Sequence, residues 1–411
     1  MENPKIRFKG FTKDWEQRKL SEITTMHARI GWQNLRTSEF LDSGDYMLIT
    51  GTDFNDGAIN YSTCHFVERE RYEQDKHIQI KNGSILITKD GTLGKVAYVQ
   101  GLSMPATLNA GVFNVEIKDE TEVNDKYLFQ YLKAPFLMDY VNKKATGGTI
   151  KHLNQNILVD FPVFMPSKAE QEEIGTYFEK LDNLITLHQR KCEQTKNLKK
   201  YMLQKMFPQN GAKVPEIRFY GFTYDWEQRK LIDYLEVSSE KNRDNRFTKD
   251  DVLSVSGEYG IVNQIEFQGR SFAGVSVSNY GVVENGDVVY TKSPLKSNPY
   301  GIIKTNKGIP GIVSTLYAVY KPKEITDSKF VQIYFELDSR MNSYMHPLVN
   351  KGAKNDMKVS AENALKGMVS FPKKDEQEMI SLYFSNLDHL ITLHQRQTDF
   401  YKKISFYYIS S

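Results

Sequence analysis

The sequence is poor in the features of extracellular, zinc-stabilised and membrane proteins. Its 411 residues include only two cysteines, Cys64 and Cys192, and neither belongs to a CxxC pair. Such a count does not support a disulfide framework or a structural zinc site. No apolar run approaches the roughly 20 residues that span a bilayer, and the opening MENPKIRFKGF has no signal-peptide core. We therefore expect a cytoplasmic protein.

The motifs of common catalytic sites are missing as well. The chain has no GxxxxGK[ST] loop for nucleotide phosphates, no HExxH and no GxSxG elbow. Residues 297–300 (SNPY) have one of the two prolines of an amino-methyltransferase loop, and residues 116–118 (EIK) match only half of a nuclease metal motif. We expect no catalytic residue, no metal and no cofactor in this chain.

An excess of charge of one sign is absent too. The chain has 54 basic and 51 acidic residues, a net charge of +3. This balance permits nucleic-acid binding but is not sufficient to indicate it. Hydrophobic residues make up 40% and charged residues 26% of the chain, as in an ordinary globular protein, and the length allows two domains.

What the sequence does contain is a long helical pattern over residues 168–207. Apolar and small residues recur there at alternating steps of four and three, a period near 3.5 that is typical of a helix packed along its length against another helix. Pro166 and a capping box of Ser167 and Glu170 mark its start, and Pro208 marks its end.

The same pattern returns 206 residues later. LDNLITLHQR at 181–190 becomes LDHLITLHQR at 387–396. Two near-identical copies favour an antiparallel helix pair, in which the repeated histidines have a packing role. After residue 396 the match fades, so we expect a shorter second helix. The predicted interface of the pair consists of Ile174, Phe178, Leu181, Ile185, His188, Ile380, Phe384, Leu387, Ile391 and His394.

A second repeat opens each half of the chain. Residues 5–20 (KIRFKGFTKDWEQRKL) and 216–231 (EIRFYGFTYDWEQRKL) match at 13 of 16 positions. The alternation of Ile6 and Phe8 indicates an extended segment followed by a turn. We expect Trp15 to anchor this segment to the domain body.

Between these repeats lie two bodies with a similar plan and different residues. In the first, β-like runs cut by Asn-Gly and Asp-Gly turns precede a helical stretch at 126–140; in the second, a strand at 288–291 precedes a helix near 329–341. The predicted fold class is α+β, with two similar mixed α/β domains separated by two long antiparallel helices and related by an internal pseudo-twofold repeat. The predicted segments are a first domain (1–160), a first helix (161–207), a linker (208–215), a second domain (216–370) and a second helix (371–411).

Loops of both bodies are rich in side chains that contact nucleic acids. Glycines there allow close approach to a phosphate, and Arg, Gln and Asn pair with base edges. The candidate DNA-binding residues of the first body are Arg29, Gln33, Arg36, Lys89, Thr92, Lys95, Lys143, Lys144, Thr149 and Lys151. Those of the second body are Lys241, Arg243, Arg246, Lys292, Lys296, Asn298, Tyr300, Lys351, Lys354 and Lys358.

Taken together, the chain resembles the specificity subunit of a type I restriction-modification enzyme. The resemblance is carried by the repeated IRFxGFTxDWEQRKL opening, by GTLGKVA at 91–97, by GGTIK at 147–151 and by the Pro-x-x-x-Glu-Gln entry into each long helix. It implies that each body is a target-recognition domain reading half of a split double-stranded DNA site, with the helices as a coiled-coil spacer.

The same resemblance implies partners. Two methyltransferase (modification) subunits would carry S-adenosylmethionine for DNA methylation at adenine, and restriction subunits using ATP and Mg would cut foreign DNA in phage defence. The chain itself would be a non-catalytic recognition subunit. Two other readings remain open: a self-sufficient DNA methyltransferase or nuclease, which the missing motifs disfavour, and a two-domain DNA-binding scaffold without modification partners.

Overall fold

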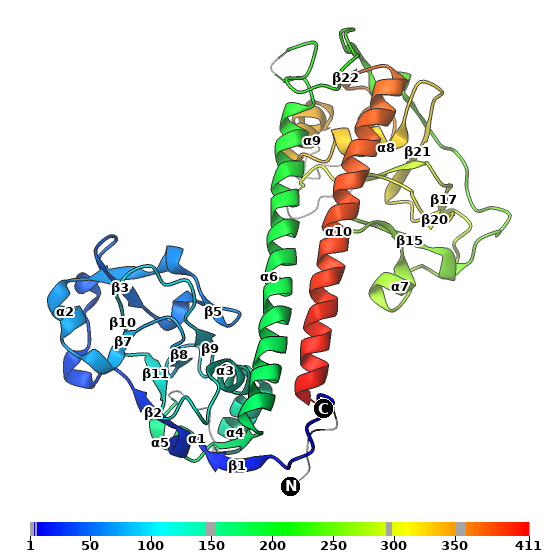
Figure 1. The fold of residues 1–411 in the computed structure, drawn as a ribbon. Coiled ribbons are helices and arrows are strands. Elements are labelled where there is room, and N and C mark those ends of the chain that lie inside the picture. The colour runs from blue at the N-terminus through cyan, green and yellow to red at the C-terminus, as the bar shows by residue number, and fades with distance from the viewer. Residues whose placement is uncertain are drawn as a thin grey trace. The chain divides into compact units, whose positions relative to one another are not determined.

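The computed structural model describes residues 4, 6–144, 153–209, 211–292, 298–349 and 359–410. It consists of two compact units (Figure 1). Unit 1 comprises Met1–Leu187 and Gln397–Ser411, and unit 2 comprises His188–Arg396. This division differs from the segments expected from the sequence, because each unit includes part of both long helices.

Unit 1 contains two four-stranded sheets. The first is antiparallel and has the order β2 (Thr24–His27), β11 (Val112–Ile117), β8 (Ile85–Thr88), β9 (Val96–Tyr98). The second has the order β6 (His65–Val67), β3 (Tyr46–Ile49), β10 (Ala106–Leu108), β7 (Gln79–Ile80), and only its β3–β10 pair is parallel. A small hairpin and two short helices complete this part: β4 (Phe54–Asn55), β5 (Ala58–Ile59), α1 (Leu20–Ile23) and α2 (Arg69–Glu73).

The helical stretch expected at 126–140 is two helices. They are α3 (Asp125–Lys133), which packs against β9, and α4 (Pro135–Lys144). The break lies at Ala134, whose backbone is extended (ψ 158°), because the ring of a following proline disfavours the helical conformation. A short α5 (Gln155–Val159) comes later in the chain.

Unit 2 repeats this plan with other residues. Its antiparallel sheet has the order β14 (Leu235–Val237), β21 (Tyr317–Pro322), β18 (Val288–Thr291), β19 (Ile303–Thr305), the counterpart of β2-β11-β8-β9. The expected helix near 329–341 is again two helices, α8 (Ser328–Tyr334), which packs on β19, and α9 (Asp338–Met345). The remaining elements are β15 (Leu253–Ser256), β16 (Gly260–Asn263), α7 (Gln264–Gln268), β17 (Gly281–Val283) and β20 (Gly311–Val313).

The sequence repeats build the same frame in each unit. The opening repeat supplies β1 (Glu16–Lys19), which pairs with β12 (Pro162–Met165), and β13 (Glu227–Lys230), which pairs in the same register with β22 (Met368–Phe371). Both pairs are antiparallel, and β12 and β22 each lead directly into a long helix. The entry and the exit of each domain body therefore lie side by side.

A buried ion pair joins the opening repeat to the long helix. Arg7 binds both carboxylate oxygens of Glu170 at 2.5 and 2.7 Å, and Arg218 binds Glu376 at 2.7 Å through both oxygens. Glu170 is fully buried. Its backbone N–H lies 3.4 Å from the Ser167 hydroxyl, so one half of the predicted capping box is present, while its carboxylate binds Arg7.

The next residue of each helix makes a second matched set of contacts. The Gln171 amide donates to the carbonyls of Glu122 and Pro166 and accepts from the Asn124 N–H. Gln377 does the same with the carbonyls of Ile325 and Pro372 and with the Asp327 N–H. The repeated Glu-Gln thus fixes each helix start to the body that precedes it.

The tryptophan of each opening repeat is an anchor, as predicted. Trp15 lies edge-on to Tyr127, and Trp226 is buried against Phe207 and Phe330. The indole N–H of Trp226 also donates to Glu376, at 3.4 Å.

The two long helices are α6 (Lys168–Lys205) and α10 (Lys374–Ser410), with 38 and 37 residues. The second helix is therefore not markedly shorter, contrary to the expectation from its fading sequence match. Within unit 2 their contacts run in opposite directions: His188 faces His394, Cys192 donates to the carbonyl of Ile391, and Lys199 binds Asp388. The predicted antiparallel α+β architecture is confirmed.

The residues expected to form the helix interface have different surroundings. Phe178, Leu181 and Ile185 are buried, and Ile174 packs against the core of unit 1. Ile380, Phe384 and Leu387 belong to the core of unit 2, together with Leu203, Met206 and Phe207 from the end of α6. Several apolar positions of the helices therefore complete a domain core.

Candidate nucleic-acid interface

The β8–β9 turn of unit 1 is closed by a buried threonine. The Thr88 hydroxyl accepts from the Lys95 N–H at 3.0 Å and donates to the Thr92 carbonyl, and the Thr88 N–H donates to the Lys95 carbonyl. Gly91 and Gly94 adopt positive φ angles of 72° and 69°, which favour glycine. The side chains of Thr92 and Lys95 are exposed at this turn.

Helix α4 packs closely on this turn. A side-chain carbon on Gly94 would lie 2.1 Å from the Met138 sulfur, so α4 approaches the turn as closely as glycine permits. Lys143 and Lys144 are exposed at the end of this helix, and the Lys144 ammonium lies 5.5 Å from the centre of the Tyr140 ring.

Lys89 connects the turn to the β10–β11 loop. Its N–H donates to the Gly111 carbonyl, and its half-buried ammonium lies 5.5 Å from the centre of the Phe113 ring. The ammonium therefore borders an aromatic face, a position that tolerates a cation with little hydration.

Two candidates of the first body are interior residues, which corrects the prediction. Arg29 is 1% exposed and donates to the Leu108 carbonyl, the Thr107 hydroxyl and the Gln74 side chain. Burial lowers the pKa of its guanidinium. Gln33 is 4% exposed, and its carbonyl lies 3.4 Å from Arg29. These side chains hold the segment before Arg36 in place, whereas Arg36 itself is exposed.

Unit 2 closes the corresponding turn in the same way. The Thr291 hydroxyl accepts from the Ile302 N–H at 2.8 Å, and the Thr291 N–H donates to the Ile302 carbonyl. Gly301 has φ 82°, and a side-chain carbon there would lie 1.9 Å from the Thr291 carbonyl oxygen. Asn298 and Tyr300 on this turn are partly exposed, and the Tyr300 carbonyl accepts from the Tyr290 hydroxyl.

The basic residues of unit 2 lie in three environments. Lys292 donates to the Thr315 carbonyl, and burial together with the nearby Lys241 ammonium lowers its pKa. A phosphate beside this pair would relieve their mutual repulsion. Arg243 is exposed, whereas Arg246 forms an exposed ion pair with Glu284 at 2.6 Å. The remaining candidates lie outside the described residues: Thr149, Lys151, Lys296, Lys351, Lys354 and Lys358.

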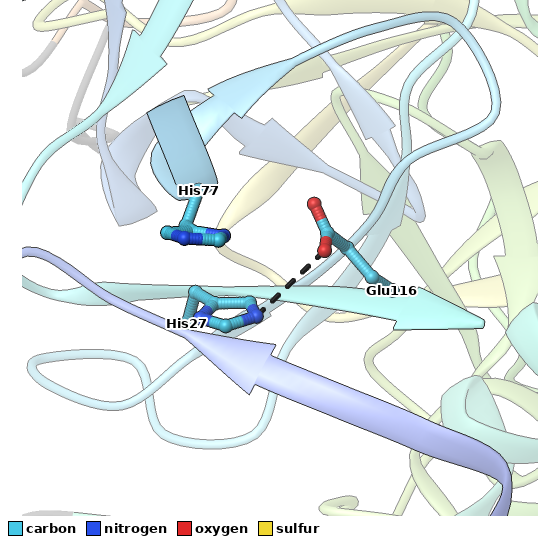
Figure 2. A group of neighbouring side chains, drawn as sticks. All are labelled: His27, His77 and Glu116. Atoms are coloured by element: carbon cyan, nitrogen blue, oxygen red, sulfur yellow. Dashed lines mark ion pairs between the residues drawn. The ribbon is translucent and has the colours of Figure 1, made fainter. Parts of the chain in front are cut away.

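The structure also brings together a group that the sequence did not indicate. His27, His77 and Glu116 have their ligand atoms within 4.8 Å of one another (Figure 2). The three residues come from β2, a 3-10 turn and β11, separated by 50 and 39 positions, so no local spacing could reveal them. This group could hold a metal ion and is considered below.

Comparison with known proteins finds a family model in the first half of the chain and relatives that extend further. Residues 12–197 match the family model for the type I restriction modification DNA specificity domain. The MjaIX specificity subunit of Methanocaldococcus jannaschii is 26% identical over 57% of this chain and 54% of its own length, and the putative MjaX specificity subunit of the same organism is 24% identical over 94% and 90%. This chain thus spans about half of the first relative and most of the second.

The fold is also known from a solved structure. The S subunit of a type I restriction-modification system from M. genitalium superimposes with a TM-score of 0.63 at 14% identity, over 99% of this chain and 98% of that one. A helix able to cross a bilayer is absent from the part of the chain that the structure describes. In residues 12–197, and over most of its length in the second relative, the chain is therefore similar to type I restriction-modification specificity subunits, and unit 2 repeats the frame of the matched domain.

Proposed function

We propose that this chain selects the DNA sequence for a type I restriction-modification complex, with each unit reading one half of a bipartite site. The observation that carries the proposal is the repeated turn closed by Thr88 in unit 1 and by Thr291 in unit 2. The first turn joins β8 to β9, and the second joins their counterparts β18 and β19 in the equivalent sheet of unit 2. Both turns present basic or amide side chains.

The two turns differ in length and composition, as expected if each contacts a different DNA sequence. In unit 1 the bonded residues are Thr88 and Lys95, and in unit 2 they are Thr291 and Ile302, which gives a longer turn of different composition. Phosphate contacts position a protein on DNA, while base contacts differ with the sequence that is read. The two units share the same frame of strands and differ in the turn. This arrangement would let both units bind DNA in the same orientation while each recognises a different sequence.

The paired helices suit the role of a spacer. Two half-sites on one face of B-DNA lie about 34 Å apart per helical turn, and α6 alone has 38 residues, about 57 Å at 1.5 Å per residue. In the proposed complex the helix pair sets the gap between the half-sites.

Partner subunits supply the chemistry in this proposal. Two methyltransferase subunits dock on the chain and carry S-adenosylmethionine, and restriction subunits use ATP and Mg. A net charge of only +3 fits a reader whose partners provide much of the attraction to phosphates. The chain acts as the non-catalytic recognition component.

The test is to map methylated adenines in DNA from a host that expresses the chain with its methyltransferase subunits. The wild-type chain should direct methylation to a two-part sequence. Lys95→Ala should relax or weaken recognition of one half only, and Lys81→Ala, an exposed lysine at the other end of β8, should leave both halves unchanged. Equal loss at both halves in the Lys95→Ala map would contradict independent reading.

A second measurement separates this function from a self-sufficient methyltransferase. The purified chain mixed with DNA and S-adenosylmethionine should transfer no methyl group until methyltransferase subunits are added. Methylation by the chain alone would refute the proposal.

A further inference from the structure

We propose that His27, His77 and Glu116 form a binding site for a divalent transition-metal ion of the zinc class in unit 1. The group combines two imidazoles and a carboxylate, whose ligand atoms all lie within 4.8 Å of one another. The proposal is independent of the DNA-reading role, because it rests on these side chains alone.

The sheet places two of the three ligands on one face. In the antiparallel register of β2 and β11, His27 lies opposite Asn114, and Glu116 is two residues further along β11. Because side chains alternate along a strand, Asn114 and Glu116 project from the same face as His27. Figure 2 shows His77 facing the His27 ring from a neighbouring turn.

That turn is firmly attached to the domain. His77 belongs to the 3-10 turn Lys76–Ile78, whose Ile78 is fully buried. The His77 N–H donates to the Asp75 carboxylate at 2.9 Å. The third ligand therefore comes from a fixed backbone, and only its side chain is exposed.

The distances are close to those of a coordinated ion. His27 Nε2 and Glu116 Oε2 are 3.7 Å apart, and ligands about 2.0 Å from a tetrahedral zinc ion lie about 3.3 Å from one another. The two imidazoles are stacked, with ring centres 4.5 Å apart and an angle of 19° between them. Their lone pairs do not converge in this arrangement, so one ring must turn on binding. The exposed His77 side chain has room to do so.

Asn114 supports the ligands from behind. It is 1% exposed, and its amide nitrogen donates to the His77 carbonyl at 3.0 Å and to Glu116 Oε1 at 3.1 Å. Two acceptors on this nitrogen fix the orientation of the amide. Its oxygen has no hydrogen-bond partner among the described residues. The bond to Glu116 orients a ligand group directly, and such contacts increase metal affinity, whereas the bond to the His77 carbonyl fixes only the backbone of that ligand.

The ligand set indicates which ion would bind. Imidazole nitrogens suit Zn²⁺, Co²⁺ and Ni²⁺, whereas Mg²⁺ and Ca²⁺ prefer oxygen ligands. Three protein ligands leave a coordination position for water or an outside group. The thiol of Cys64 is a poor competitor, because burial raises its pKa to about 12.

Calorimetric titration of ZnCl₂ into the full chain tests the proposal. One equivalent should bind with a micromolar dissociation constant, and His77→Ala and Glu116→Gln should each weaken binding by at least about tenfold. Glu116→Gln is a conservative variant, because its amide oxygen can still accept from Asn114. His389→Ala, an exposed histidine on α10, is the matched control and should bind as the wild type does.

Co²⁺ provides an independent readout, since its visible spectrum reports the coordination geometry. The wild-type complex should show the intense bands of a four-coordinate site, and His27→Ala should lose them. Metal-free melting curves of the variants should match the wild type, because the ligands are partly exposed. Absence of zinc binding, or unchanged binding in both His27→Ala and His77→Ala, would overturn the proposal.

Discussion

Arg7 and Arg218 occupy equivalent positions in the two opening repeats and make the same contacts. Each binds a buried glutamate at the start of a long helix through two nitrogens, and each also donates to a carbonyl of its own opening repeat, that of Lys13 or Tyr224. A buried carboxylate without a cation is costly, because the protein interior solvates it poorly. This pairing explains why both opening repeats contain the arginine and both long helices begin with the glutamate.

Removing one of these arginines should destabilise one unit. Arg7→Ala leaves Glu170 buried without its partner and should cost about 3 kcal/mol. Arg18→Ala on the same segment breaks partly exposed pairs with Glu122 and Glu22 and should cost less than about 1 kcal/mol. Hydrogen exchange resolved by segment checks this, since only amides of unit 1 should exchange faster in Arg7→Ala. Equal effects of the two substitutions would contradict the assigned role of Glu170.

His188 should make the stability of unit 2 depend on pH. Its Nδ1 lies 3.1 Å from Nδ1 of His394. Burial lowers the pKa of the His188 imidazole below 6.5, and the nearby His394 and Lys191 lower it further. A lowered folded pKa means that the unfolded chain binds the proton more readily. Stability is therefore full above about pH 6.5 and is lost as the pH falls through and below that value.

The measurement is the free energy of unfolding between pH 8 and 5. His188→Gln keeps a polar group beside His394 but does not titrate, so its stability should fall less steeply over this range. Identical slopes for the variant and the wild type would show that the pair does not act in this way.

For individual residues, the sequence showed which segments are rich in DNA-contacting residue types, but it did not show which side chains are exposed. Arg29 and Gln33 had the composition of a DNA-binding loop, yet they are buried, because the carbonyls at residues 33 and 108 need donors. Nothing in a local pattern distinguishes an inward from an outward arginine. His27, His77 and Glu116 were missed since only the β2–β11 register brings them together.

Among the elements, α6 makes an unusually close approach to α3. A side-chain carbon on Gly175 would lie 2.9 Å from the Asn124 side-chain oxygen and 3.0 Å from the Tyr127 nitrogen. Asn124 is the residue that caps α3. The aligned position in α10 is Ser381, which is buried, so unit 2 accommodates a larger residue there.

Gly175→Ala should therefore destabilise unit 1 despite its better helix propensity. The gain of about 1 kcal/mol from replacing glycine in a helix is outweighed by overpacking, which typically costs about 1–3 kcal/mol. Thr176→Ala, at the next and exposed position, should be neutral or slightly stabilising. Thermal unfolding of both variants checks the prediction, and a stabilised Gly175→Ala protein would contradict it.

The elements themselves were largely predictable. β18 matches the strand expected at 288–291, the strands of unit 1 before α3 match the expected β-like runs, and α6 starts where the sequence predicts. These features were predictable because period and turn residues are local signals. The two split helices were not foreseen. The break between α3 and α4 follows from Pro135. By contrast, α8 and α9 are separated by Phe335 to Leu337 without a proline or glycine, so no local signal marks that break.

For the whole molecule, the internal repeat carried most of the prediction. The copies, offset by 206 residues in the long helices and by 211 in the opening repeats, predict two like units and an antiparallel helix pair. The surfaces that distinguish the units were not predictable in the same way, because the bodies share a strand order but few residues.

The proposed spacer can be lengthened. One heptad inserted into α6 between Arg190 and Lys191, and one into α10 between Thr392 and Leu393, would preserve the 3.5-residue period of the pair. This adds about 10 Å, so the methylated site should keep both half-sequences with a gap longer by up to about three base pairs at 3.4 Å each. An insertion in α6 alone puts the helices out of register and should abolish methylation. An unchanged gap in the paired variant would refute the spacer role.

The adjacent ends of each domain body have a consequence for how such a protein changes over time. Since β1 and β12, like β13 and β22, bring the first and last residues of a body together, an entire body can be exchanged as a cassette without disturbing the scaffold. The nearly identical opening repeats would give an exchanged body the same frame contacts in either unit. If the proposed function holds, replacing one body as a unit would change one half of the recognised site while the paired strands at its base stay the same.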